Sequence, residues 1–162
     1  MPRTAFPIEQ LLTVLTETPS RIVDATTGVP AAILHAAPND EWSANDVLAH
    51  LRACADVWGG NIATMLAEDK PTWRAINPRT WITRTDYLDL RFRPSLRAFT
   101  DQRTDFLALL QTMSPAGWSR TAIVLGGGRP LELTVLDFAQ RLARHERPHV
   151  KQIARVVRAV QG

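Results

Sequence analysis

Two histidines four residues apart, His145 and His149, are the residues in this sequence best suited to chemistry. The apolar periodicity around them predicts a helix, and residues four apart lie on one helical face because each residue turns by about 100°. Apolar side chains occupy that same face, so both imidazoles should point inward. Neutral imidazole nitrogens bind zinc and other transition metals well, and the pair therefore indicates a metal site.

A third histidine, His50, lies on the inward face of another predicted helix, where apolar residues recur at intervals of three and four. With His145 and His149 it would give a divalent metal three protein ligands. Such a set leaves coordination positions open to water or substrate, as catalytic sites do. The alternative is three core histidines that are hydrogen-bonded to the backbone or to water and hold no metal.

Three neighbours of these histidines allow more than one interpretation. Cys54, one turn beyond His50, would be a fourth ligand or, more commonly for a lone buried cysteine, a small core residue. Gln152, one turn past His149, would hydrogen-bond a ligand or simply end the core stripe. Pro148 lies between the two ligands of the last helix and predicts a kink there, which is either tolerated or opens a coordination position.

The elements that must position these residues are four amphipathic helices. Acidic residues three positions after a hydroxyl residue predict capping boxes at Ser43 with Asp46 and at Thr134 with Asp137. Pro19 interrupts the first helical pattern, which is therefore one kinked helix or two short ones. The predicted helices cover residues 7–28, 43–65, about 88–112, and 134 to about 160.

Two connections between these helices differ from ordinary loops. Residues 68–87 form a long crossover that could cover the site. In that case Arg79 would bind a substrate carboxylate. The alternative is that Trp73 and Trp81 only anchor the segment. Residues 119–133 alternate around Gly126-Gly127-Gly128 and predict a short hairpin or extended loop, not a phosphate loop. The chain should therefore be all-α, a four-helix bundle with almost no strand.

Composition narrows the class of protein. The 162 residues predict a single domain over 1–162, and the one cysteine excludes an internal disulfide and fits a reducing compartment. We expect a cytoplasmic protein without a membrane segment, since no apolar run is long enough to span a bilayer. The net charge of +3 is too modest to indicate nucleic acid. His35 fits no pattern and is expected in a loop or at the surface.

The last helix also carries a basic stripe on its outer side. A solvated face is the ordinary explanation, and an anion-binding surface is the alternative. The stripe has neither the aromatic platforms nor the recognition-helix pattern of nucleic-acid binders. Its members are Arg141, Arg144, Arg147, Lys151, Arg155 and Arg158.

The segments WSANDVLAHL around His50 and RHERPHVKQI around His145 and His149 resemble the DinB/YfiT-like superfamily in sequence and in spacing. The resemblance covers most of the chain. It implies an up-down-down-up four-helix bundle with the long crossover between helices 2 and 3, and a homodimer. It also implies one divalent metal on His50, His145 and His149, with zinc or nickel expected ahead of iron or manganese.

The same resemblance implies a function. Members of the superfamily include small-thiol-dependent S-transferases and isomerases, so we expect a metal-dependent enzyme acting on a small-molecule electrophile, with a low-molecular-weight thiol as cosubstrate. The alternative is a non-catalytic metal-binding or stress-related helical bundle. The enzyme hypothesis predicts open coordination positions that face a pocket, and the non-catalytic alternative predicts a closed or empty site.

Overall fold

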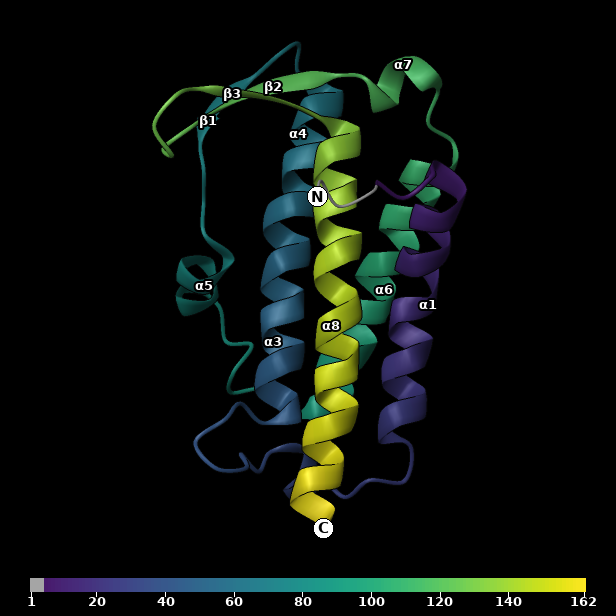
Figure 1. The fold of residues 1–162 in the computed structure, drawn as a ribbon, viewed down its shortest axis with the longest axis vertical. Helices are drawn as coiled ribbons and strands as arrows, with labels where there is room; N and C mark the ends of the chain where they lie inside the picture. The colour runs from purple at the N-terminus through teal and green to yellow at the C-terminus, as the bar shows by residue number, and fades with distance from the viewer. Residues whose placement is uncertain (1–4) are drawn as a thin grey trace.

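The computed structural model describes residues 5–162 and is built around four long helical segments (Figure 1). They are α1 (Ile8–Thr26), α3 (Ala44–Cys54) with a π-helical turn (Ala55–Gly59) and α4 (Gly60–Ala67), α6 (Phe92–Gln111), and α8 (Val135–Gln161). Single turns of helix separate them: α2 (Ala31–Leu34), α5 (Pro78–Trp81), a 3-10 turn (Ile82–Arg84) and α7 (Pro115–Trp118).

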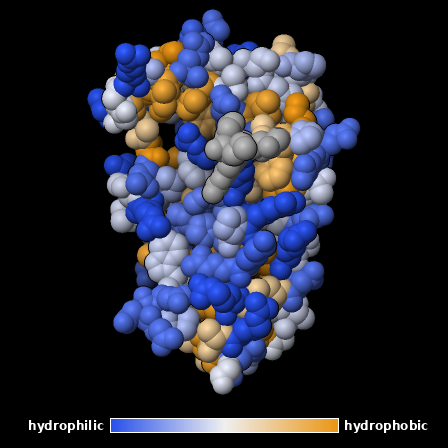
Figure 2. Space-filling view, viewed as in Figure 1, coloured by the Kyte–Doolittle hydropathy of each residue, from blue (hydrophilic) through white to orange (hydrophobic). Residues whose placement is uncertain are grey.

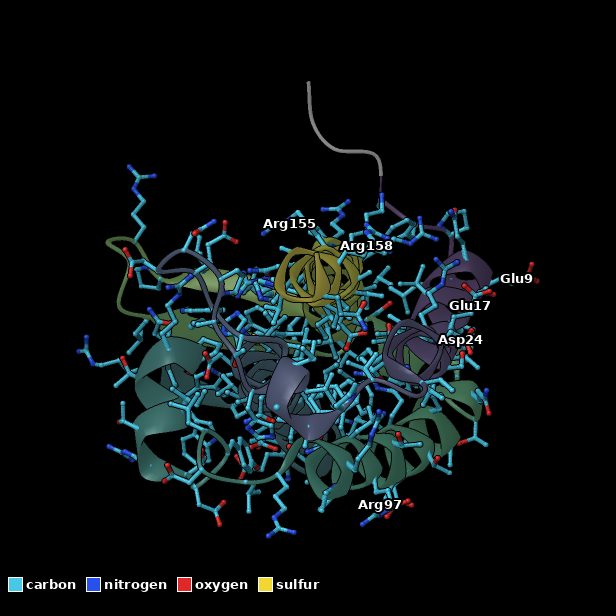
Figure 3. The ribbon with its side chains drawn as sticks, turned by 90° about the horizontal axis from the view of Figure 1, so that it is seen from below. Glu9, Glu17, Asp24, Arg97, Arg155 and Arg158 are labelled. Atoms are coloured by element: carbon cyan, nitrogen blue, oxygen red, sulfur yellow. The ribbon has the colours of Figure 1, made fainter. Side chains whose placement is uncertain are left out.

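The four segments pack as a square bundle. In Figure 1 the chain descends in α1, ascends through α3 and α4, ascends again in α6 and descends in α8. Helix α8 packs against α1 and α3, and α6 packs against the same two helices from behind. The view along the bundle axis shows the helices end on (Figure 3). No helix in residues 5–162 is both long enough and apolar enough to span a bilayer.

Both predicted capping boxes are present and start the two helices that carry the three histidines. At α3 the Asp46 backbone N–H donates to Ser43 Oγ (3.0 Å), and the Ser43 N–H donates to Asp46 Oδ2 (2.9 Å). At α8 the Asp137 N–H donates to Thr134 Oγ1 (3.0 Å), and the Thr134 N–H donates to Asp137 Oδ2 (2.8 Å). Each box satisfies backbone donors that the first helical turn leaves unpaired.

The structure decides between the two alternatives for the first helix and corrects the start of the third. Helix α1 is a single helix with Pro19 buried inside it, in agreement with one of the two alternatives expected. Helix α6 begins at Phe92 instead of near residue 88, because Pro94 in its first turn would clash with the carbonyl of Leu90 if the helix began earlier. That carbonyl accepts a hydrogen bond from the Asn45 side chain instead (3.1 Å).

A small mixed sheet caps one end of the bundle (Figure 1). The predicted hairpin forms from β2 (Thr121–Leu125) and β3 (Leu131–Thr134), which pair antiparallel. The crossover adds a third strand, β1 (Thr72–Arg74), parallel to β2, and this corrects the expectation of almost no strand. The Trp73 ring packs on Phe138 with 6.0 Å between centroids, so the crossover is tied to the start of α8.

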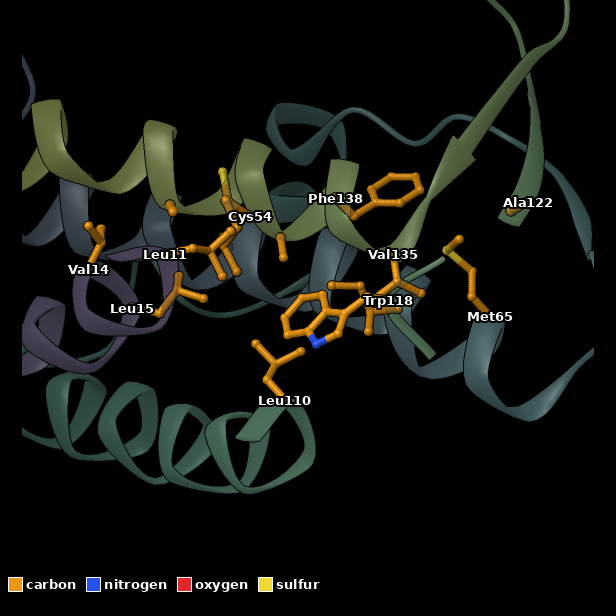
Figure 4. Close-up of a cluster of buried hydrophobic side chains, with 14 of the residues drawn as sticks. Leu11, Val14, Leu15, Cys54, Met65, Leu110, Trp118, Ala122, Val135 and Phe138 are labelled. Atoms are coloured by element: carbon orange, nitrogen blue, oxygen red, sulfur yellow. The ribbon is translucent and has the colours of Figure 1, made fainter. Parts of the chain in front are cut away.

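Two hydrophobic clusters fill the bundle. The cluster nearer the sheet contains Leu11, Leu15, Leu110, Trp118 and Phe138 (Figure 4), and Cys54 lies in it as well. The second cluster lies toward the other end and includes Ile22, Leu48, Phe92, Phe99 and Ile153. The histidine cluster is on the α3–α8 side of this core.

We predict that Thr134→Ala lowers the free energy of unfolding by about 1 kcal/mol, because it removes the side-chain acceptor of the α8 capping box. Urea denaturation measures the change. Thr104→Ala is the matched control, since Thr104 is exposed within α6 and caps no helix. Equal losses in the two variants would show that the capping box does not stabilise α8.

Candidate metal centre

The structure brings the three predicted histidines together from two helices. His50 on α3 is buried, with 5% of its surface exposed, and His145 and His149 on α8 are partly buried. Their ring centroids are 4.5 to 5.0 Å apart. One ring nitrogen from each lies within 4.8 Å of the other two. Helix–helix packing has therefore assembled three nitrogen donors around one point.

The spacing of these nitrogens suits a divalent transition metal. Imidazole nitrogens bind zinc at ~2.0–2.1 Å, so two ligands of a tetrahedral ion are ~3.3 Å apart. His50 Nε2 and His145 Nε2 are 2.8 Å apart, and small ring rotations would bring them to that spacing. The donor set is nitrogen only, which suits zinc, nickel and related ions better than magnesium or calcium.

The protonation states of the site suit the same role. Burial, followed by the charges of His149 and His145 and by that of Arg79, lowers the pKa of His50 from 6.5 to about 4. Burial, then His149 and Arg79, lowers the pKa of His145 to about 4 as well. Both rings are therefore neutral at pH 7 and keep a nitrogen lone pair for a metal.

Gln152 orients the third ring. Its Oε1 lies 2.7 Å from His149 Nδ1, so a proton on Nδ1 is held by an acceptor and the lone pair remains on Nε2. The structure thus favours the hydrogen-bonding role for Gln152 over a plain polar end to the stripe.

Two tryptophans enclose the histidines. The Trp42 ring stacks on His149 at 6.5 Å with an interplanar angle of 19°, and it lies 5.2 Å from the His50 ring. Trp58 meets His145 edge-on at 5.1 Å. Trp58 lies in the π-helical turn, a departure from α-helix that often occurs at functional sites and that no sequence pattern had indicated.

Cys54 does not join the histidine group, although its Sγ lies 3.6 Å from His50 Nε2. Burial, with a smaller contribution from the charge of Glu146, raises the pKa of the thiol to about 12. The side chain is a neutral thiol at pH 7 and packs in the core (Figure 4). This is the commoner of the two roles considered for it.

A buried ion pair lies directly behind the two α8 histidines. Glu146 is 0% exposed and accepts hydrogen bonds from Nη1 and Nη2 of Arg103 and from the Thr18 hydroxyl (2.7 Å). Sequence reasoning missed this pair. The sequence does carry a signal for it, which is a charged residue on an otherwise apolar helical face. Glu146 lies eight residues after Phe138, and Arg103 lies four residues after Phe99.

Pro148 does not interrupt α8, which continues as helix to Gln161. The proline is exposed and lines a cavity beside the histidines. The rings of His145 and His149 still converge with it in place. His35 is exposed as expected and accepts a hydrogen bond from the Phe92 backbone N–H (3.2 Å) at the start of α6.

Two cavities reach the histidine cluster. The one along α8 has a volume of about 550 Å³ and is lined by His145, His149, Arg141, Arg144 and Pro148, among others. The second has a volume of about 360 Å³ and reaches His50 from the crossover side, beneath α5. The site is accordingly open to small molecules from two directions.

The basic stripe behaves mainly as a solvated face. Hydrophilic residues gather along α8 in Figure 2, and Arg155 and Arg158 point outward from that helix in Figure 3. Several members already have partners: Arg155 pairs with Glu41 (2.9 Å), while Arg141 and Arg147 lie over aromatic rings.

We predict that Arg103→Met lowers the free energy of unfolding by about 3–5 kcal/mol, because it leaves the Glu146 carboxylate buried without a counter-charge. Adding Glu146→Leu should recover part of that loss, since no charge then remains buried. Arg21→Met, which breaks an exposed pair with Glu17, is the control and should cost under about 1 kcal/mol. A double variant less stable than Arg103→Met would contradict this account.

The lowered histidine pKa values predict a pH dependence for the metal-free protein. Between about pH 6.5 and 4, the unfolded chain protonates His50 and His145 while the folded chain does not, so stability falls as pH falls through that range. Replacing both residues by glutamine should flatten this part of the profile, as measured by urea denaturation at several pH values. Parallel profiles for the two proteins would refute the prediction.

Comparison with known proteins agrees with this architecture. The structure of YfiT from Bacillus subtilis, described as a probable metal-dependent hydrolase with an unusual four-helix bundle topology, matches 98% of this chain and 91% of its own. The TM-score is 0.79 and the identity 19%, which shows a shared fold. No curated protein matches the chain by sequence. The family model of the DinB superfamily matches residues 15–153, and the chain therefore belongs to the DinB superfamily.

Proposed function

We propose that this chain holds one divalent transition metal on His50, His145 and His149 and is an enzyme that acts on small-molecule electrophiles. The convergence of three imidazole nitrogens from two helices carries this proposal. Within residues 5–162 the group contains only these three side chains, so a bound ion would keep positions free for reactants. A metal held in this way supplies Lewis-acid chemistry that activates water or a thiol near neutral pH.

The chain's own residues prepare this site in separable ways. Burial keeps the His50 and His145 rings neutral, and Gln152 fixes the orientation of His149. Trp42 and Trp58 pack against the rings of His149 and His145. Zinc or nickel suits three imidazole nitrogens best, with iron or manganese as weaker alternatives.

We infer a low-molecular-weight thiol as the second reactant, which makes the protein an S-transferase or isomerase. The observation in favour is that two separate cavities reach the histidines, since a thiol and an electrophile need room on different sides. Hydrolysis is the second candidate, supported by the fold shared with YfiT, which is described as a probable metal-dependent hydrolase. A non-catalytic metal-binding bundle is the alternative outside enzyme chemistry.

Elemental analysis of protein purified without a histidine tag tests the metal. We expect about one metal ion per chain in the wild type, loss of metal in His149→Ala, and wild-type content in His35→Ala, whose histidine lies outside the cluster. No bound metal in the wild type after incubation with zinc, nickel or manganese would contradict the proposal.

Activity assays on the metal-loaded protein distinguish the reaction classes. We expect mycothiol or bacillithiol to be consumed with an alkyl halide, and the rate to vanish in His149→Ala. Hydrolysis of para-nitrophenyl acetate without added thiol would favour the hydrolase instead. A protein that binds metal and shows neither reaction on a broad panel of electrophiles would be the non-catalytic bundle.

A further inference from the structure

The residues that line the cavity beneath α5 indicate which class of ligand it binds, and they do so more narrowly than the metal site does. Its apolar walls come from Trp42, Ile82 and Leu88, and His50 forms the end nearest the metal cluster. Among the described residues, two charged side chains line it, Arg79 and Asp46. Asp46 is already engaged, because its Oδ2 accepts the Ser43 N–H in the α3 capping box.

Arg79 is held in a way that leaves its donors available. Its guanidinium lies over the Trp42 ring, 5.0 Å from the centroid, and it forms no ion pair with a carboxylate in the described part of the chain. A guanidinium stacked on an aromatic face keeps its N–H groups directed outward in its own plane. That planar fork matches the two oxygens of a carboxylate.

The backbone under Arg79 is fixed to the bundle. Asn77 caps α5 by accepting the Arg79 N–H at 2.9 Å. At the other end of α5, Trp81 Nε1 donates to Asp56 (3.2 Å), and the Tyr87 hydroxyl donates to the same carboxylate oxygen (2.6 Å). Trp81 thus anchors the crossover, and it holds Arg79 at the cavity mouth.

We propose that this cavity binds a small organic carboxylate with an apolar body, such as an aromatic or branched acid, and that Arg79 pairs with the carboxylate. Trp42, Ile82 and Leu88 contact the apolar body, and the ligand lies beside His50. A volume of about 360 Å³ accommodates a molecule of this size. The inference rests on the proposed function only where it makes this ligand a reactant of the enzyme. Binding of the ligand by the cavity and Arg79 does not require a metal.

Binding of benzoate and of benzyl alcohol, its neutral counterpart, tests the proposal. Affinities are measured by calorimetry or ligand-observed NMR on the wild type, Arg79→Gln and Arg84→Gln, each with and without zinc. Arg84 is the matched control, an exposed arginine of the same crossover that does not line the cavity. We expect Arg79→Gln to weaken benzoate binding by about tenfold in both metal states. Benzyl alcohol binding, and benzoate binding to Arg84→Gln, should stay unchanged.

Three results would overturn the proposal: no benzoate binding by the wild type up to the solubility limit, equal benzoate affinity in Arg79→Gln and wild type, or an equal loss in Arg84→Gln. Benzoate that binds only with zinc, and regardless of Arg79, would show the metal to be the anion site. The metal-free measurements keep this test separate from the proposed function, because they can succeed in a protein that proves to hold no metal.

Discussion

The carboxylate of Glu146 is completely buried, and its hydrogen-bond partners within residues 5–162 are Arg103 of α6 and Thr18 of α1. Helix α8 is therefore held at one rotation about its axis, because turning it would strand a charge in the core at a cost of several kcal/mol. At about 100° per residue, His145 and His149 then lie together to one side of Glu146. That side faces α3, where His50 completes the group.

The inward side of α8 thus carries two polar groups that face in different directions, the ion pair and the histidines. Toward α1 and α6 the helix presents the paired charge of Glu146. Toward α3 it presents the rings of His145, whose lowered pKa keeps it unprotonated at pH 7, and of His149. Rigid support behind a ligand pair is what a metal site needs, since ligands that shift by an ångström lose their shared geometry. Stability and site geometry consequently depend on the same turn of α8.

Much of this arrangement was predictable because the signals are local. The capping boxes at Ser43 and Thr134 depend only on residues three apart, and the inward faces follow from helical periodicity. The parallel pairing of β1 with β2 was not predictable in this way, since it joins Trp73 to Val124, which are far apart in the sequence. Nor does any residue type mark the π-helical turn, and the partner of Glu146 becomes evident only once α6 lies against α8.

X-ray absorption spectroscopy of the zinc-loaded protein tests the central claim most directly, because it reports which atoms surround the metal. We predict a shell of nitrogen or oxygen atoms at ~2.0–2.1 Å containing three imidazoles, and no sulfur. His50→Ala should remove one imidazole from that shell. A sulfur scatterer at ~2.3 Å would make Cys54 a ligand, and fewer than three imidazoles in the wild type would show that the histidine cluster is not the metal site.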